Sequence, residues 1–448
     1  MRSLIRTRAF AAVAAGALLI SACAPGSNSN SAGQPSGAVR TDVGAKPVTL
    51  TLLVNSGVDV SYFTALGKLF HAKHPTVTVK VDNQDYQALT TNIAHILSGS
   101  DVPDLVRVSQ FGNLIKDHLL ASLDPYAKAY GWDSWPQSQF AATRVGPDGT
   151  ERGTGTLYGA GPGFGLTGVY YNKILTHRIG MTQPPATVAE FEQLLGKAKD
   201  AGLQPMTING KDGGTVYPLQ NLTMDYAGDA QAVQDWNFDK PGANIDTPAL
   251  VKAATTLQRW SRAGYLPADV NNLDQTQAPA DFLKRDSVFF PSGNWQAPGL
   301  DKAAPGKFGF FLFPPDTAGG KEWAMTATDN LAIPAKSPHA DVAAAFLNFI
   351  QTDPQARQDT VTLGGIVPAG PANASIPSAP AGSAVAATVS AFRQLLTADG
   401  LVGFMADATA SIHVNTLIPQ VQLLLGGKTS PQALAAKVQS DYEQDLGR

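Results

Sequence analysis

Cysteine is almost absent from this chain: one residue, Cys23, occurs among 448. This excludes an intramolecular disulfide and a metal site of the Cys-x-x-Cys type. Charged residues are also few, at 15% of the chain, and the formal net charge is only −3. No basic stretch with interleaved aromatic residues occurs. The composition therefore argues against nucleic acid as a partner.

Long apolar runs are also lacking. The stretch at residues 9–20 follows three arginines and is shorter than the about 20 apolar residues that a membrane-spanning helix needs. A positive start followed by a short apolar stretch is typical of a secretory signal peptide, which we place at residues 1–22. The sequence therefore predicts an exported protein.

The end of this leader carries a second signal. Ile20-Ser21-Ala22-Cys23 resembles the lipobox of bacterial lipoproteins, in which the cysteine becomes the lipidated first residue. Residues 23–45 are rich in Ser, Gly, Asn and Pro, and such a segment cannot bury enough apolar surface to offset the cost of ordering. We expect a flexible tether that anchors an extracytoplasmic body to the cell membrane through a lipid on Cys23.

The body, residues 46–448, is long enough for two domains. Its first part alternates between two patterns. Predicted strands at 48–54, 76–81 and 104–108 are separated by predicted amphipathic helices at 61–75 and 86–99. This alternation predicts an α/β fold with a parallel sheet covered by helices.

Neutral polar side chains follow each of these predicted strands. They are Asn55 and Ser56, Asn83 and Gln84, and Ser109 and Gln110. Ligands of open α/β sheets bind beyond the carboxyl ends of the strands. Amide and hydroxyl groups both donate and accept hydrogen bonds, which suits a ligand rich in hydroxyls.

A glycine motif offers a different interpretation. Gly163, Gly165 and Gly168 have the G-x-G-x-x-G spacing of dinucleotide-binding loops. Such a loop must open a helix, because the free N–H groups at the helix N-terminus bind the phosphates. Here residues 169–175 (VYYNKIL) follow, and this β-branched and aromatic run predicts a strand. The motif therefore does not indicate a nucleotide site.

The same segment begins with Tyr158-Gly159 and ends with Tyr170-Tyr171-Asn172-Lys173. It resembles the interdomain crossing strand of extracellular solute-binding proteins of the sugar-binding type, relatives of maltose-binding protein that serve ABC importers. Further stretches in the order of that family are residues 69–81, 96–105, 118–126, 282–295, 328–351 and 423–439. The family commonly has proline where Gly161 stands, and polar residues where Phe164, Gly165 and Leu166 follow.

This resemblance implies a two-lobed periplasmic-binding-protein-like α/β fold. Each lobe is expected to be a mostly parallel sheet flanked by helices, with the ligand cleft between the lobes. The N-terminal lobe is expected at residues 46–157 plus about 330–365. The C-terminal lobe is expected at 158–329 plus about 366–448.

A sugar ring presents hydroxyls at its rim and C–H groups on its faces, so its site needs aromatic rings as well as hydrogen-bonding groups. Trp295, which follows a predicted strand at 287–290, matches a family tryptophan and is the expected stacking residue. The other candidates for the cleft are Tyr86, Phe164, Trp236, Asn294, Asp329, Asn330, Gly364, Gly365 and His413. Trp236 fits the core equally well, while Trp132, Trp135 and Trp260 are expected in the core.

Signals for catalysis are weak. His71 and His74 lie at the end of a predicted helix without a third metal ligand nearby, and neither a G-x-S-x-G motif nor a nucleophilic cysteine occurs. We therefore expect a monomeric, non-enzymatic protein without metal or cofactor that binds a mono- or oligosaccharide by hinge closure and delivers it to a membrane permease.

Two alternatives stay open. The same fold could bind a non-sugar solute such as a polyol phosphate, a peptide or a polyamine, or the chain could be a secreted lipoprotein hydrolase. An anionic ligand requires arginines in the cleft, and a polyamine requires several carboxylates. The sequence offers no arginine among the candidates and Asp329 as the one carboxylate.

Overall fold

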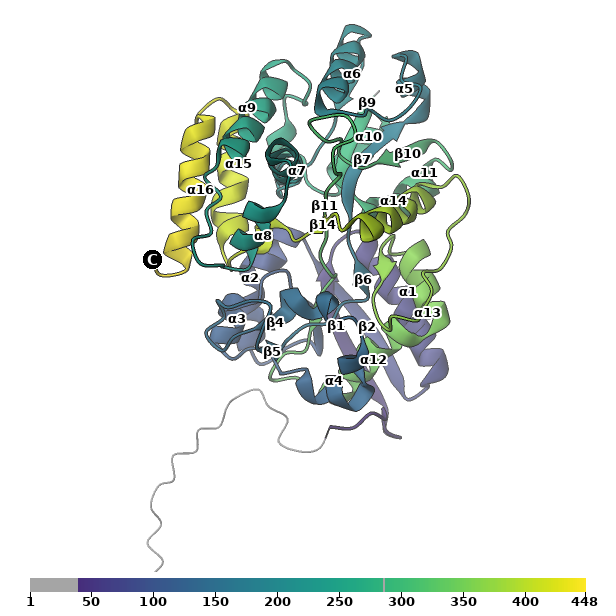
Figure 1. Ribbon diagram of the computed structural model, residues 1–448. Coiled ribbons are helices and arrows are strands. Elements are labelled where there is room, and N and C mark those ends of the chain that lie inside the picture. The colour runs from purple at the N-terminus through teal and green to yellow at the C-terminus, as the bar shows by residue number, and fades with distance from the viewer. Residues whose placement is uncertain (1–38, 285–286) are drawn as a thin grey trace, which may run out of the picture. The chain divides into compact units, whose positions relative to one another are not determined.

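The computed structural model describes residues 39–284 and 287–448 (Figure 1). The expected signal peptide, Cys23 and the tether as far as residue 38 lie outside the described residues. No helix in the described ranges is long and apolar enough to cross a lipid bilayer.

The first sheet has the strand order β12-β3-β1-β2. Its strands are β1 (Val48–Asn55), β2 (Val77–Gln84), β3 (Leu105–Arg107) and β12 (Leu331–Ala332). Strand β1 pairs in parallel with β2 and β3, whereas β12 arrives from far along the chain and pairs antiparallel with β3. The three strands predicted in this region are confirmed, with ends that shift by up to three residues.

Helices cover this sheet because their apolar residues recur on one face. Helix α1 (Val58–Lys73) buries Tyr62, Leu66 and Phe70 at a spacing of four residues, which is the spacing of one helical face. It packs against β2 and against two helices from the later chain, α12 (Ala340–Thr352) and α13 (Pro354–Thr362). Helix α2 (Tyr86–Ser98) buries Leu89, Ile93 and Leu97, and the Asp85 side chain caps its N-terminus.

The second sheet has the strand order β10-β7-β9-β8. Its strands are β7 (Thr167–Asn172), β8 (Gln204–Met206), β9 (Ser287–Gly293) and β10 (Phe308–Phe311). The expectation of a mostly parallel sheet is wrong here, because β7 runs antiparallel to both β9 and β10, and only β8 and β9 are parallel. The antiparallel pairing places the end of β9, at Gly293, beside the start of β7, at Thr167.

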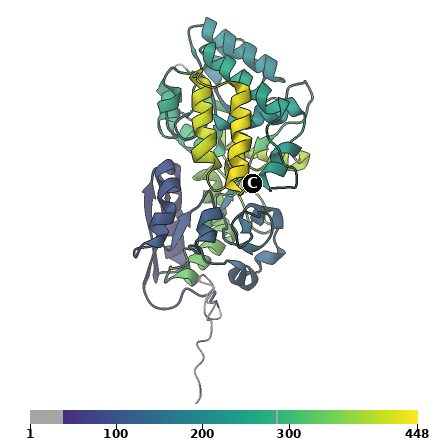
Figure 2. The ribbon, with the colours of Figure 1, turned by 90° about the vertical axis from the view of Figure 1, so that its left-hand side faces the viewer.

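Around the second sheet, helix α9 (Pro248–Arg262) packs against α7 (Val216–Ala227), α15 (Ile418–Leu425) and α16 (Pro431–Asp445). Figures 1 and 2 show α15 and α16 side by side at the C-terminal end of the chain. The Thr187 side chain caps helix α6 (Val188–Asp200), since its hydroxyl accepts a hydrogen bond from the backbone N–H of Glu190 at 3.1 Å.

Apart from α14, which has 15 residues, the remaining elements are short. The helices are α3 (Gly112–Lys116), α4 (Asp124–Tyr130), α5 (Lys173–Arg178), α8 (Gln231–Asn237), α10 (Gln277–Lys284), α11 (Ala297–Ala303) and α14 (Ala384–Ala398). The strands are β4 (Arg144–Val145), β5 (Thr156–Leu157), β6 (Gly163–Phe164), β11 (Ala324–Met325), β13 (Val367–Pro368) and β14 (Leu401–Val402). The 3₁₀-helical segments are η1 (Trp132–Ser134), η2 (Gln137–Thr143), η3 (Val270–Asn272), η4 (Asn294–Gln296) and η5 (Met405–Asp407), and η6 (Ile412–Leu417) is a short π-helix.

Separate hydrophobic clusters lie under the two sheets. The cluster of the first sheet contains Trp132 and Trp135, and a larger cluster under the second sheet contains Trp260, as expected of these three tryptophans. The α/β class with helix-flanked sheets is thus confirmed, whereas the residue boundaries of the lobes stay a prediction.

Three chain segments, which we call the connecting segments, run together between these regions: residues 158–166, 326–331 and 364–369. Strand β6 pairs with β13, and isolated bridges join Ala160 to Leu331 and Phe164 to Thr328. Gly165 N donates to Ala327 O at 2.8 Å, and Asp329 N donates to Gly163 O at 2.9 Å. The three segments therefore form one small hydrogen-bonded unit.

Glycine is needed in the first connecting segment because other backbones approach it closely. A Cβ atom at Gly161 would lie 2.8 Å from the backbone of Asp329, and one at Gly163 would lie 2.4 Å from Val367 O. The chain continues from Gly168 as strand β7, without the helix that a phosphate-binding loop requires. The G-x-G-x-x-G spacing thus serves backbone packing.

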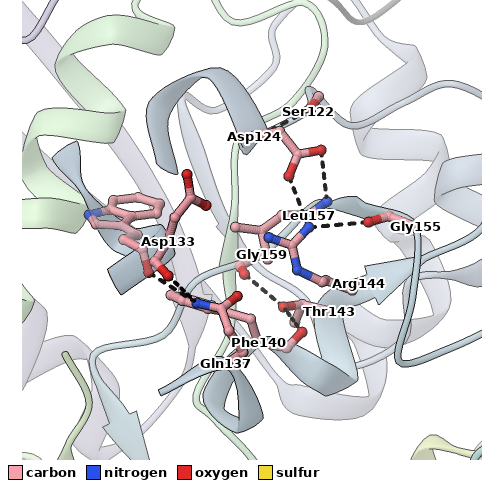
Figure 3. Close-up of polar contacts among 11 residues, drawn as sticks. Ser122, Asp124, Asp133, Gln137, Phe140, Thr143, Arg144, Gly155, Leu157 and Gly159 are labelled. Atoms are coloured by element: carbon pink, nitrogen blue, oxygen red, sulfur yellow. Dashed lines mark hydrogen bonds and ion pairs between the residues drawn. The ribbon is translucent and has the colours of Figure 1, made fainter. Parts of the chain in front are cut away.

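The entry to this segment is fixed by polar contacts. Thr143 Oγ1 donates to Gly159 O at 2.8 Å, and Arg144 Nη1 donates to Asp124 Oδ1 at 3.0 Å and to Gly155 O at 3.1 Å (Figure 3). The backbone N–H of Leu157 also donates to Asp124. Hydrogen bonds therefore hold the chain in place where the first connecting segment begins.

Candidate functional site

A cavity of about 330 Å³ lies where the connecting segments meet the ends of β1 and β3. It takes polar residues from the strand ends, aromatic residues from helices beside both sheets and from the chain around Trp295 and Phe404, and backbone from the connecting segments. Residues that line it and were predicted from the sequence are Asn55, Ser56, Tyr86, Ser109, Trp295, Asp329, Asn330, Gly364 and His413. The structure therefore brings together nine side chains or backbone positions that are scattered over the whole body.

Seven other candidates do not line this cavity, and one of them is Gln84, the last residue of β2. Asn83 lies behind it and accepts a hydrogen bond from Ser56 Oγ at 2.8 Å, and Gln110 donates to Ala406 O at 3.2 Å. Phe164 packs against Phe392 in the core, and Gly365 approaches the backbone of Asn294. These four residues surround the cavity and are not part of its lining.

Trp236 and Asn294 have structural roles. Trp236 is 0% exposed and stacks on Tyr442 with ring centroids 4.4 Å apart, so it belongs to the core of the second sheet. Asn294 is buried, and its side chain accepts from Leu166 N at 2.9 Å and donates to Phe164 O at 3.2 Å. These two bonds tie the turn that carries Trp295 to the first connecting segment.

Trp295 belongs to an aromatic wall. Its ring meets Tyr217 edge to face at 6.0 Å, and Tyr217 meets Phe404 in the same way at 5.9 Å. The Trp295 ring lies against the backbone of Gly293, where a Cβ atom would come within 2.0 Å of it. Aromatic faces held in this way can stack on the C–H faces of a ligand.

A charged group occupies the side of the cavity next to β3. Arg107 Nε donates to Asp329 Oδ1 and lies 3.7 Å from Asp59 Oδ2, and the three side chains are 22%, 11% and 19% exposed respectively. Burial and the neighbouring Asp329 raise the pKa of Asp59 to about 7, against the effect of Arg107. Burial opposes the charge of Arg107, but the two carboxylates raise its pKa above the ordinary value.

Two more carboxylates line the cavity, Asp212 and Asp407. Burial raises the pKa of each to about 6. Asp212 accepts hydrogen bonds from the Asn209 amide and from Gln275 N, the latter at 2.7 Å. Arg152 donates to the backbone carbonyl of Asp407 from the chain between β4 and β5. The expectation that Asp329 is the one carboxylate of the site is therefore wrong.

His413 is also buried. Burial lowers its pKa to about 4, so the ring is neutral at pH 7. Its Nδ1 lies 3.2 Å from the Tyr86 hydroxyl, while its Nε2 has no hydrogen-bond partner among the described residues. This contact joins α2 to η6 across the cavity.

The residues that sequence reasoning missed differ in how they could have been found. Asp59 follows β1 by four residues, so a search one helical turn beyond the strand end would have included it. Arg107 ends β3 itself. Tyr217 and Phe404 come from elements without a motif, and only the tertiary structure places them beside Trp295.

In the described part of the chain, no cluster of three or more His, Cys, Asp or Glu side chains could hold a metal ion. His71 has a different partner, because its Nδ1 lies 2.6 Å from the carbonyl oxygen of Val77.

Comparisons with known proteins agree with this fold. The family model of the bacterial extracellular solute-binding proteins matches residues 55–357. The diacetylchitobiose binding protein DasA of Streptomyces coelicolor is 25% identical over 359 residues, which covers 78% of this chain and 79% of that protein.

Solved structures share the fold at lower identity. A chitin oligosaccharide binding protein superposes with a TM-score of 0.74 at 21% identity, covering 90% of this chain and 100% of the other. The bacterial solute receptor AcbH, described as preferring β-D-galactopyranose, gives a TM-score of 0.75 at 17% identity over 89% of this chain and 99% of its own. The family model matches more than half of this chain, so the chain belongs to the bacterial extracellular solute-binding proteins.

Proposed function

We propose that this protein is the lipid-anchored substrate-binding subunit of an ABC importer. It captures a mono- or oligosaccharide by hinge closure between two lobes and delivers it to the membrane permease. The observation that carries the proposal is the cavity itself, which combines an aromatic wall with amide, hydroxyl and carboxylate groups beside the connecting segments. This mixture matches a ligand with apolar faces and a hydroxylated rim.

The relatives support this ligand class. DasA is named for diacetylchitobiose, and proteins of similar fold are named for chitin oligosaccharide, for β-D-galactopyranose and for raffinose. All of these ligands are carbohydrates.

The charges of the cavity favour a neutral ligand over an anion. The one arginine in the lining, Arg107, is already engaged by Asp329 and Asp59. The carboxylates can accept hydrogen bonds from paired hydroxyls, which orients a sugar ring strongly. A polyol phosphate would place its charge beside four aspartates and is therefore disfavoured.

Closure gives the protein its function in transport. The three connecting segments are short and hydrogen-bonded to each other, so small torsion changes in them can turn one lobe against the other. A ligand favours the closed form only by its extra affinity for that form. A micromolar dissociation constant corresponds to roughly −8 kcal/mol, which a few hydrogen bonds and a stacked ring can supply.

The experiment is a thermal-shift screen of the purified Cys23→Ser protein, which cannot carry the lipid. The panel contains N-acetylglucosamine, diacetylchitobiose, galactose, raffinose and xylobiose, with spermidine and glycerol 3-phosphate as non-sugar probes. A ligand at a hundred times its dissociation constant adds about 2.7 kcal/mol of stability. Binding by spermidine or glycerol 3-phosphate without any sugar would refute the carbohydrate proposal.

Trp295→Ala tests the site, and Tyr130→Ala is its control. Tyr130 stacks on Trp132 outside the cavity lining, so its loss lowers stability without touching the ligand. We expect the sugar-induced shift to disappear in Trp295→Ala and to persist in Tyr130→Ala. Chemical identity of the recovered sugar, checked by mass spectrometry, tests whether the protein binds without altering its ligand.

The same Cys23→Ser change tests the anchor. In cells, the native protein is expected in the membrane fraction and the variant in the soluble extracytoplasmic fraction. An unchanged distribution would contradict lipidation at Cys23.

A further inference from the structure

A second cavity of about 230 Å³ adjoins the first. The two cavities share Asn55, Arg107, Val108 and Ser109, so the ends of β1 and β3 form a common wall. The second cavity continues from this wall between α2 and α3 on one side and residues 410–415 on the other. It is thus an extension of the site along the same strand ends.

The chemistry of the second cavity differs from that of the first. Its lining is rich in neutral hydrogen-bonding side chains: Asn55, Thr90, Thr91, Ser109, Gln110, Asn113, Ser411 and Asn415. Among the described residues that line it there is no aromatic ring, and the one charged side chain, Arg107, already contacts Asp329 and Asp59. Such a lining suits uncharged hydroxyl or amide groups and offers no surface for stacking.

The Tyr86–His413 contact lies at the boundary between the cavities. Both residues line the first cavity, whereas the residues that follow them on the same elements, Thr90 on α2 and Val414 on η6, line the second. A single 3.2 Å contact between the Tyr86 hydroxyl and His413 Nδ1 joins the two elements here. The remaining ring nitrogen, Nε2, is buried next to Gly213 and has no hydrogen-bond partner among the described residues.

We propose that the second cavity is a further subsite, which takes an additional neutral sugar unit of an oligosaccharide whose first unit lies against Trp295. This proposal rests on the proposed carbohydrate function. The first cavity alone is near the lower end of the about 300–1,000 Å³ range of small-molecule sites, and the two together fall well inside it. The subsite also gives a role to Gln110, a predicted site residue that the first cavity does not use.

The test uses two filling variants, each of which places a tryptophan side chain in the second cavity. Thr90→Trp fills the cavity from α2, and Val414→Trp fills it from η6. Asn92→Trp is the matched control, because Asn92 is exposed on the same helix and outside the lining of both cavities. The probes are N-acetylglucosamine, diacetylchitobiose and triacetylchitotriose, and in parallel xylose, xylobiose and xylotriose, with affinities measured by titration calorimetry.

We expect the native protein to bind the longer members of one series more tightly than the shortest member that binds. Each filling variant should weaken the longer members by at least tenfold and leave the shortest within about twofold, while Asn92→Trp changes none of them. Retained binding of the shortest sugar shows that the variant is folded. Should one variant fail to fold, the other tests the same cavity.

Three results would overturn the subsite. They are equal affinity of the native protein for all lengths, an equal loss for all lengths in both filling variants, and no loss for any length in a folded filling variant. The proposed function fails separately, if the native protein binds no sugar of either series or of the wider panel.

Discussion

The position of Trp295 depends on the absence of a side chain at Gly293. The backbone of Gly293 is extended, with φ −107° and ψ 169°, so its torsions do not require glycine. Glycine is required here for lack of space, because an added Cβ would come within 2.0 Å of the Trp295 ring. Gly293→Ala should therefore displace the ring that we assign to ligand stacking, although residue 293 itself does not line the cavity.

The magnitude follows from this contact. Carbon atoms pack best at about 3.5 Å or more, so the ring has to retreat by about 1.5 Å. Overpacking of this kind costs roughly 1–3 kcal/mol of folding stability. Loss of a well-placed aromatic contact costs about 0.5–1.5 kcal/mol, which corresponds to a roughly 2- to 13-fold weaker affinity.

Gly299→Ala is the matched control for this change. Gly299 lies within helix α11 at an exposed position where an added Cβ meets nothing within 4 Å. Alanine is preferred over glycine in a helix by roughly 0.5–1 kcal/mol, so this variant should be slightly more stable and bind normally. Denaturant unfolding and titration calorimetry measure both quantities. Native affinity of a folded Gly293→Ala protein would refute the role of the Trp295 ring position.

Three further predictions concern charge, closure and capping. Because the pKa of Asp59 is raised to about 7, its ionisation lowers the stability of the folded protein as the pH rises from about 4 to 7. The stability of Asp59→Asn relative to the native protein, measured by urea titration, should therefore be higher at pH 8 than at pH 5. The same difference at both pH values would contradict this. Arg152→Ala removes the hydrogen bond to Asp407 O and should speed sugar dissociation about tenfold in stopped-flow experiments. Arg144→Ala should leave the dissociation rate unchanged, because the partners of Arg144 lie on its own side of the cavity. Equal dissociation rates in the two variants would exclude a role of Arg152 in closure. Thr187→Ala should lower the free energy of unfolding by about 1 kcal/mol through the lost cap of α6, with unchanged sugar affinity as its internal check.

Local patterns were sufficient to predict strands β1, β2 and β3 of the first sheet and helices α1 and α2. The period of apolar residues in α1 and the alternation in β1 are set by neighbours in sequence, so they can be read before folding. The strand-end rule then located Asn55, Ser56 and Ser109, since the register of a parallel sheet brings these ends to one edge. The direction of β9 could not be predicted from the sequence, because its antiparallel pairing with β7 depends on the path of over a hundred intervening residues.

The site was predicted less completely for a similar reason. Trp236 and Trp295 are both tryptophans beside polar residues, and only packing decides that one stacks on Tyr442 and the other lies at the cavity. The carboxylates Asp59, Asp212 and Asp407 are separated by long stretches of sequence and converge only in the folded chain. Charge convergence of this kind has no local signature.

In the proposed function, the connecting segments serve both lobe closure and ligand contact. Gly165, Asp329 and Gly364 lie on these segments and also line the cavity, so a ligand bound there would rest directly on the segments that we propose to twist. A substitution that retunes selectivity at these positions would also alter how readily the protein opens. New ligand preferences are therefore more accessible through residues such as Tyr217 and Phe404, which can vary without disturbing the pivot.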